Sequence, residues 1–192
     1  MSRFNEASIE DAALGYFGEI GYATVWGPNI APGEPGQERA SFQDVLLEGR
    51  LRASISRINA SLGDSLIEEA IKKLKRAESQ NAIDENYRIH KLITAGVPVE
   101  HRGADGEIRT TRVWLVDFDH PNRNDWLAVN QFTVVQEGKN RRPDIVVFLN
   151  GLPIGLLELK NSADQNATLK SAWNQIQTYR KDIPSLFAPN AI

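Results

Sequence analysis

Two apolar runs joined by Asn-Gly constrain the fold of this chain more than any other feature of its sequence. They lie in the segment RRPDIVVFLNGLPIGLLELKN at residues 141–161. Each run is almost continuously apolar, which is typical of a strand that is buried on both faces of a sheet. Asn-Gly between two such runs is a strong signal for a tight turn. The segment therefore predicts a β-hairpin in the interior of a sheet.

Three charged side chains interrupt this apolar segment: Asp144 before the first run, and Glu158 and Lys160 at the end of the second. A buried charge is normally paired or bound to a metal. Glu158 and Lys160 are two residues apart, so they share a face of their strand. A two-residue turn alone would point Asp144 away from Glu158, whereas a three-residue loop at residues 150–152 or a β-bulge would set the carboxylates opposite each other. We expect one of the latter two arrangements.

Two carboxylates that face each other repel unless a cation lies between them. An oxygen-rich pair suits Mg²⁺, which keeps several waters and favours phosphate ligands. Such an ion can polarise a phosphodiester and activate a water, while Lys160 holds that water or stabilises developing negative charge. Lys139, Arg141 and Arg142, just upstream, are candidates for contacts with neighbouring phosphates. The pattern favours phosphodiester hydrolysis.

Periodicity and turn signals along the rest of the chain indicate an α/β domain: helices first, then an antiparallel meander, then a final helix. A helical subregion covers about residues 41–95, and the polar segment 117–125 is interpreted as a hairpin loop. The predicted helices are 8–20, 42–58, 66–78, 84–94 and 167–181, and the strands outside the central hairpin are 97–102, 107–119 and 125–136.

The composition bounds these expectations. The chain has 192 residues, 41% hydrophobic and 24% charged, which is enough for one domain with a real core. It contains no cysteine, which fits a reducing compartment. Acidic residues among the first twenty argue against a secretory signal, and the longest apolar stretch, 145–157, is too short for a bilayer. We expect a cytoplasmic protein without a membrane partner, and a net charge of −3 restricts any DNA contact to a local surface or one shared with partner chains.

The Pro-Asp pair, the 13 residues between Asp144 and Glu158, and the Glu-Leu-Lys that follows resemble the PD-(D/E)xK nuclease signature. The segments VNQFTVVQ and WNQIQTYRKDIPSLFAPN lie on either side of it in the order of one particular family. Over nearly its whole length, the chain resembles the N-terminal endonuclease domain of the R (HsdR) subunit of type I restriction-modification enzymes.

The resemblance implies a restriction-endonuclease-like fold: a mixed, mostly antiparallel sheet flanked by helices, with an N-terminal helical insertion. It implies that Asp144, Glu158 and Lys160 are catalytic. It also implies that Mg²⁺ is held by the two carboxylates and by the backbone carbonyl of Leu159.

Supporting residues are also implied. Gln175 and Tyr179 match a Q-x-x-x-Y element on the following helix, four residues apart and so on one face. Tyr179 also continues an apolar stripe, so packing is the alternative role for this residue. Glu10 is the candidate for an acidic residue on the first helix near the metal, with Glu6 second.

The family implies cleavage of double-stranded DNA, coupled in the full enzyme to translocation by ATP-driven motor domains. Its partners are a methyltransferase (M) and a specificity (S) subunit. This chain contains no G-x-x-x-x-G-K-[ST] loop, so we expect ATP to be used by domains outside it. We expect residues 1–192 to be a nuclease domain truncated before its last core strand. Two alternatives remain: a free-standing DNA repair nuclease, and a non-catalytic DNA-binding or assembly module.

Overall fold

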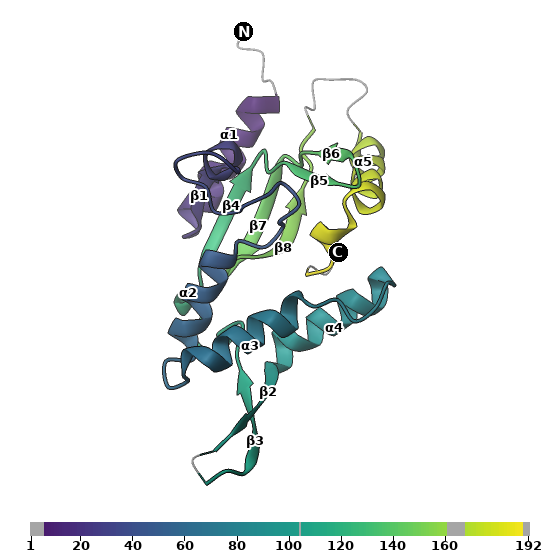
Figure 1. Ribbon diagram of the computed structural model, residues 1–192. Helices are drawn as coiled ribbons and strands as arrows, with labels where there is room; N and C mark the ends of the chain where they lie inside the picture. Colours follow the sequence, from purple (N-terminus) through teal and green to yellow (C-terminus); the bar gives the residue numbers. More distant parts are fainter. Residues whose placement is uncertain (1–5, 104, 161–167, 190–192) are drawn as a thin grey trace.

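The computed structural model describes residues 6–103, 105–160 and 168–189 of the chain (Figure 1). The chain begins with α1 (Glu6–Glu19), β1 (Ala23–Trp26) and a short 3₁₀ turn (Gly27–Ile30). Three helices follow: α2 (Glu48–Ile58), α3 (Asp64–Lys75) and α4 (Ala82–Ala95). The remaining elements are β2 (Val97–Arg102), β3 (Ile108–Val113), a 3₁₀ turn (Pro121–Arg123), β4 (Trp126–Asn130), β5 (Val134–Gln136), β6 (Lys139–Arg141), β7 (Ile145–Leu149), β8 (Leu152–Leu157), α5 (Leu169–Asp182) and a last 3₁₀ turn (Pro184–Phe187).

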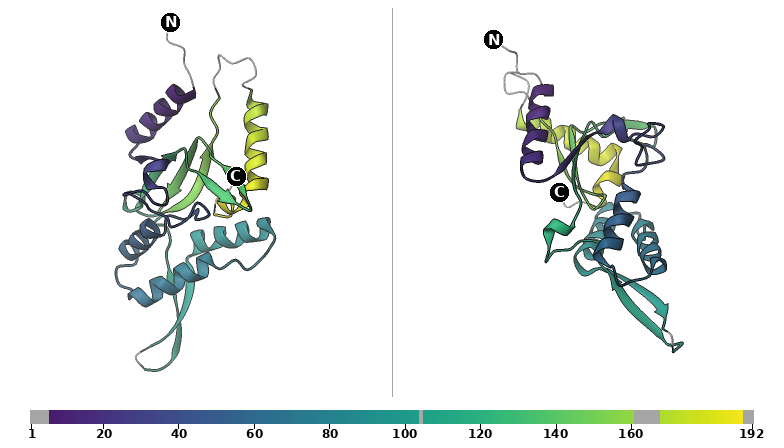
Figure 2. Two further views of the ribbon diagram at one scale, coloured as in Figure 1. Left: turned by 45° about the horizontal axis from the view of Figure 1, so that its top comes forward. Right: turned by 90° about the vertical axis from the view of Figure 1, so that its left-hand side faces the viewer.

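The central sheet has the strand order β1-β4-β7-β8. β1 runs parallel to β4, and the other two pairings are antiparallel. Figure 2 shows α1 and α5 flanking this sheet. Residues of α1 pack on one face, against Ala128 and Val147, whereas Tyr179 of α5 packs on the other, in the same cluster as Val129 and Phe148. The prediction of a mixed, mostly antiparallel sheet flanked by helices is confirmed.

The three helices between β1 and β4 and the β2–β3 hairpin share an apolar cluster, which also includes Leu149 and Leu152 on either side of the β7–β8 turn. The predicted helices 66–78 and 84–94 correspond to α3 and α4, within three residues at each end. The predicted hairpin at residues 97–119 is also present, although its second strand ends at Val113. The tip of this hairpin projects away from the central sheet (Figures 1 and 2).

Three predictions about the other elements were wrong. The helix predicted from residue 42 begins at Glu48, because Ser41 and Asp44 form a local turn: Ser41 N donates to Asp44 Oδ2, and Gln43 N donates to Ser41 Oγ. The strand predicted at 125–136 is broken at Gln131, whose φ of 55° is left-handed, so that β4 and β5 belong to different sheets. No strand was predicted at the position of β1.

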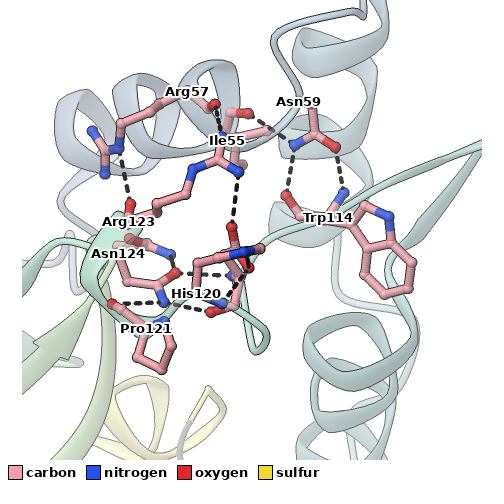
Figure 3. A network of polar contacts seen from close by, with 10 residues as sticks. Ile55, Arg57, Asn59, Trp114, His120, Pro121, Arg123 and Asn124 are labelled. Carbon is pink, nitrogen blue, oxygen red and sulfur yellow. Dashed lines mark hydrogen bonds and ion pairs between the residues drawn. The ribbon is translucent and has the colours of Figure 1, made fainter.

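The third error concerns residues 117–125, which do not close a hairpin: they join β3 to β4, and these strands lie in different sheets. Figure 3 shows how polar contacts fix this connection against α2. The Asn59 side chain bonds both backbone groups of Trp114, donating to its carbonyl at 2.8 Å and accepting from its N–H at 2.9 Å. Arg57 and Arg123 each donate to the other's carbonyl at 2.9 Å. The helical subregion is thereby tied to the chain that enters the central sheet.

The Asn150–Gly151 turn is buried rather than exposed. Both residues are left-handed, with φ of 53° and 81°, as a tight two-residue turn requires. The Asn150 side chain is fully buried, accepting from Asp125 N at 2.7 Å and donating to Leu115 O at 2.9 Å. A β-carbon at Gly151 would collide with the backbone oxygen of Leu47, at the entry to α2. Only glycine therefore fits at this second position of the turn.

Candidate active site

A β-bulge sets the register of the β7–β8 hairpin. Phe148 pairs with Pro153, but the next pair along is Val147 with Gly155, so Ile154 is an extra residue on β8. Proline has no N–H with which to continue the ladder, and glycine tolerates the local distortion. The sequence Pro-Ile-Gly thus provides a physical reason for the position of the bulge.

The bulge has a direct consequence for the two carboxylates. Beyond the bulge, Ile145 pairs with Leu157. Asp144 and Glu158 are the next residues after this pair, so they lie opposite each other at the ends of their strands. The prediction that either a longer loop or a bulge would correct the parity of this hairpin is confirmed: the turn has two residues, and the bulge makes the correction.

Asp144 is half-buried, and its Oδ2 accepts a hydrogen bond from Leu159 N at 2.7 Å. Burial raises the pKa of Asp144 to about 6. The Leu159 N–H and the positive charge of Lys160 oppose this shift, while the negative charges of Glu158 and, to a smaller extent, Glu10 add to it. Burial and the nearby carboxylates therefore outweigh the positive charge of Lys160 at this carboxyl.

Glu158 lies in a closed ring of four hydrogen-bonded side chains. Its side chain is only 1% exposed, so both oxygens depend on protein partners. Lys160 Nζ donates to one oxygen at 2.8 Å, and the Tyr179 hydroxyl donates to the other at 3.1 Å. Gln175 closes the ring: its Oε1 accepts from Lys160 Nζ at 3.0 Å, and its Nε2 donates to the Tyr179 hydroxyl at 2.7 Å. One amide thus positions both the lysine and the tyrosine.

The helix α5 delivers Gln175 and Tyr179 to this ring. It begins with a capping box in which the Thr168 and Ser171 side chains each accept from the other's backbone N–H. Tyr179 is 4% exposed and lies in the apolar cluster on that face of the sheet, so it packs in the core and bonds Glu158 at once. Burial raises the pKa of Tyr179, which keeps its hydroxyl a donor.

Glu10 of α1 lies beside this site, held by two amides. Asn130 Nδ2 and Gln131 Nε2 each donate to a different oxygen of Glu10, both at 2.5 Å. Sequence reasoning missed both amides, which stand where a buried strand ends and so look like ordinary turn residues. Of Glu6, the other candidate, the structure describes the backbone alone.

The three basic candidates lie in different surroundings. Lys139 and Arg142 are exposed. Arg141 is half-buried, and its guanidinium pairs with Asp182 near the end of α5. Arg141 thus fastens α5 to β6, and of the three it is the least available to a phosphate.

The donor set suits a hard divalent cation, since two facing carboxylates lie next to the backbone of Leu159. Within residues 6–103, 105–160 and 168–189, the structure has no group of three or more acidic or histidine side chains that could hold a metal. Any ion here would therefore rely on Asp144, Glu158, backbone carbonyls and water. In this part of the chain, Glu10 does not form a metal-binding cluster with Asp144 and Glu158.

Fold and site together define a nuclease-like α/β protein, in which a Pro-Asp and a Glu-x-Lys meet at the ends of two paired strands. The chain belongs to the family described as "Type I restriction enzyme R protein N terminus", whose model matches residues 3–192. In the part of the chain that the structure describes, no helix has the length and apolar character needed to cross a membrane.

Relatives with curated names match most of this chain. The type I restriction enzyme HindI endonuclease subunit of Haemophilus influenzae is 33% identical over 97% of the chain. The putative type I restriction enzyme MjaIXP endonuclease subunit of Methanocaldococcus jannaschii is 36% identical over 93% of it. The chain spans only 18% and 17% of the length of these two relatives.

Proposed function

We propose that this chain is the DNA endonuclease domain of a type I restriction enzyme R subunit, and that it hydrolyses phosphodiester bonds of double-stranded DNA with Mg²⁺. The observation that carries the proposal is the bulge, which sets Asp144 opposite Glu158 with Lys160 on the same strand end. β-Bulges are over-represented next to active sites, where they re-aim a side chain. Membership of the R-subunit family favours this function over a free-standing repair nuclease.

The residues present fit the cation. The carboxylates of Asp144 and Glu158 and the carbonyl of Leu159 would hold Mg²⁺, and the raised pKa of Asp144 supports this, because a half-buried carboxylate facing another carboxylate is stabilised by a cation between them. When bound, the ion supplies the polarisation of the phosphodiester and the acidity of the attacking water.

The protein's own side chains do the remaining work. Tyr179 and Gln175 fix the orientation of Glu158 and Lys160. With Glu158 engaged by a cation, the amide of Gln175 would still offer a partner to the ammonium of Lys160, which it bonds at 3.0 Å. Lys160 then orients the attacking water, or stabilises the charge that develops on the phosphate oxygens. Lys139 and Arg142, both exposed, contact phosphates that flank the cleaved bond.

The wider context is also part of the proposal. The relatives that match this chain are several times longer, and we assign ATP-driven translocation to motor domains beyond this segment. Choice of the DNA sequence belongs to the methyltransferase and specificity subunits of the complex. Such a domain would work in the cytoplasm, which the lack of cysteine also fits.

Cation binding is the decisive test. Calorimetric titration of the 192-residue chain with Mn²⁺ should show binding that Asp144→Ala and Glu158→Ala abolish. Asp64→Asn, at an exposed acidic residue at the start of α3, is the matched control and should bind as the wild type does. Failure of the wild type to bind Mn²⁺ would favour a non-catalytic assembly or DNA-binding module.

Cleavage of plasmid DNA provides the second test. Lys160→Ala should retain Mn²⁺ binding but lose cleavage, because the lysine acts on water and phosphate rather than on the ion. Cleavage by this variant at the rate of the wild type would refute the role assigned to Lys160.

A further inference from the structure

Glu10 is held in an unusual way for a carboxylate at the edge of an active site. Both of its oxygens accept from uncharged amides, Asn130 Nδ2 and Gln131 Nε2. Glu158, by contrast, is paired with the ammonium of Lys160. An amide donor fixes a carboxylate without cancelling its charge, whereas lysine or arginine would neutralise it. The contacts of Glu10 therefore combine a fixed position with a retained negative charge.

Gln131 joins this carboxylate to the cation-binding edge of the sheet. Its side chain reaches Glu10, while its backbone N–H donates to Asp144 O at 2.9 Å. Its φ of 55° is left-handed, which is uncommon for a residue other than glycine or asparagine. Such a conformation persists only where its surroundings hold it, and it is found preferentially at functional sites. A single residue thus couples α1 to Asp144.

Asn130 supports the same arrangement from the strand. It is the last residue of β4, pairs with Ile145 of β7 and is 6% exposed. Its Oδ1 is buried without a hydrogen-bond partner among the described residues. The Nδ2 of the same side chain is the group that donates to Glu10, so the amide is oriented toward this carboxylate.

We propose that Asn130 and Gln131 are positioning residues that hold the charge of Glu10 beside Asp144, so that it strengthens the attraction of the site for a divalent cation. This rests on the proposed nuclease function. The two amides act through Glu10 and do not contact substrate. Glu10 acts through space, since it forms no three-residue cluster with Asp144 and Glu158 in the part of the chain described.

A double-mutant cycle on cation affinity tests the proposal. Gln131→Ala and Glu10→Gln should each raise the Mn²⁺ dissociation constant about 10-fold, the low end of the effects measured for outer-shell residues. If Gln131 acts through Glu10, the double variant should bind as Glu10→Gln does, within about twofold. Glu137→Ala is the matched control: Glu137 is also left-handed, with φ of 49°, but lies in the exposed β5–β6 turn. It should leave the dissociation constant unchanged.

Two further measurements separate positioning from mere loosening of the fold. The effect of Glu10→Gln should shrink as salt is raised, because it is electrostatic. At saturating Mn²⁺, DNA cleavage by Gln131→Ala should return to within about twofold of the wild type, as expected for an outer-shell effect on affinity. A wild-type dissociation constant in Gln131→Ala, or additive effects in the double variant, would overturn this inference alone. Absence of Mn²⁺ binding to the wild type would overturn the proposed function instead.

Discussion

Replacing Asp144 by asparagine should stabilise the metal-free protein at neutral pH although it destroys the proposed cation site. Asparagine keeps an oxygen that can accept from Leu159 N, and it removes the negative charge opposite Glu158. Burial raises the pKa of Asp144 from 3.8 to about 6. A shift of roughly two units corresponds to a ceiling of about 3 kcal/mol. Because the side chain is only half-buried, solvent screening reduces the expected gain to about 1–2 kcal/mol.

The pH dependence of this gain follows from the direction of the shift. A folded-state pKa above the unfolded value means that the folded protein binds the proton more tightly. The contribution of protonated Asp144 to stability is then complete below about pH 4 and is lost as the pH rises through about 6. Asp144→Asn should therefore match the wild type near pH 4 and exceed it at pH 7.5. For a chain of this size the melting temperature would rise by about 2–8 °C.

Urea and thermal unfolding in EDTA at pH 4, 5, 6 and 7.5 would measure the effect, and Asp117→Asn provides a control of opposite sign. The backbone N–H of His120 lowers the pKa of Asp117, so its neutralisation should destabilise the protein at neutral pH. Addition of Mn²⁺ should raise the melting temperature of the wild type but not that of Asp144→Asn. Loss of stability by Asp144→Asn at pH 7.5, or an equal gain at pH 4, would refute the electrostatic reasoning.

Three other predictions concern the turn, the ring and the DNA surface. Gly151→Ala should lower the free energy of unfolding by about 2–4 kcal/mol, because its β-carbon would meet the Leu47 oxygen in a left-handed turn. Urea titrations measure this loss, and an unchanged midpoint would contradict the packing described for Gly151. Tyr179→Phe removes the hydrogen bond to Glu158, so it should lower stability by about 1 kcal/mol and weaken Mn²⁺ binding. If calorimetry detects no weaker binding, the role of the tyrosine is packing only. Arg142→Ala should reduce the slope of the DNA-binding constant against salt concentration by the amount of about one phosphate contact. Fluorescence anisotropy measures this slope, and an unchanged slope would exclude the contact.

The hairpin that carries the site could be predicted because several independent signals agree there. Two apolar runs indicate burial on both faces, and β7 is buried along its whole length. Asn150–Gly151 indicates the turn type, and both residues are left-handed. With a two-residue turn, Asp144 can lie opposite Glu158 only if one strand contains an extra residue, and the bulge on β8 supplies it. Its position was also open to prediction, because Pro153 cannot extend the ladder.

Other elements could not be predicted because their stability comes from contacts distant in sequence. β1 has four residues and a mostly exposed burial pattern, so no alternation marks it, and its parallel pairing with β4 depends on the assembled sheet. The start of α2 was misplaced because the apolar residues before Glu48 continue the helical spacing, whereas the backbone there is held in another conformation by the local Ser41–Asp44 turn and by a contact distant in sequence. Leu47 N donates to Gly151 O, about a hundred positions along the chain.

The same contrast separates the two kinds of residue in the candidate site. Asp144, Glu158 and Lys160 are detectable because a charge in an apolar strand conflicts with its surroundings, and that conflict needs an explanation in physical terms. Asn130 and Gln131 create no such conflict, since asparagine is favoured in turns and an uncharged polar residue beside it at the end of a strand is ordinary. Their significance lies in the carboxylate of Glu10, 120 and 121 positions earlier in the chain, which only the packing of α1 brings to them. Charges in an active site are therefore visible from local sequence, whereas neutral residues that position them become visible only when the fold supplies their partners.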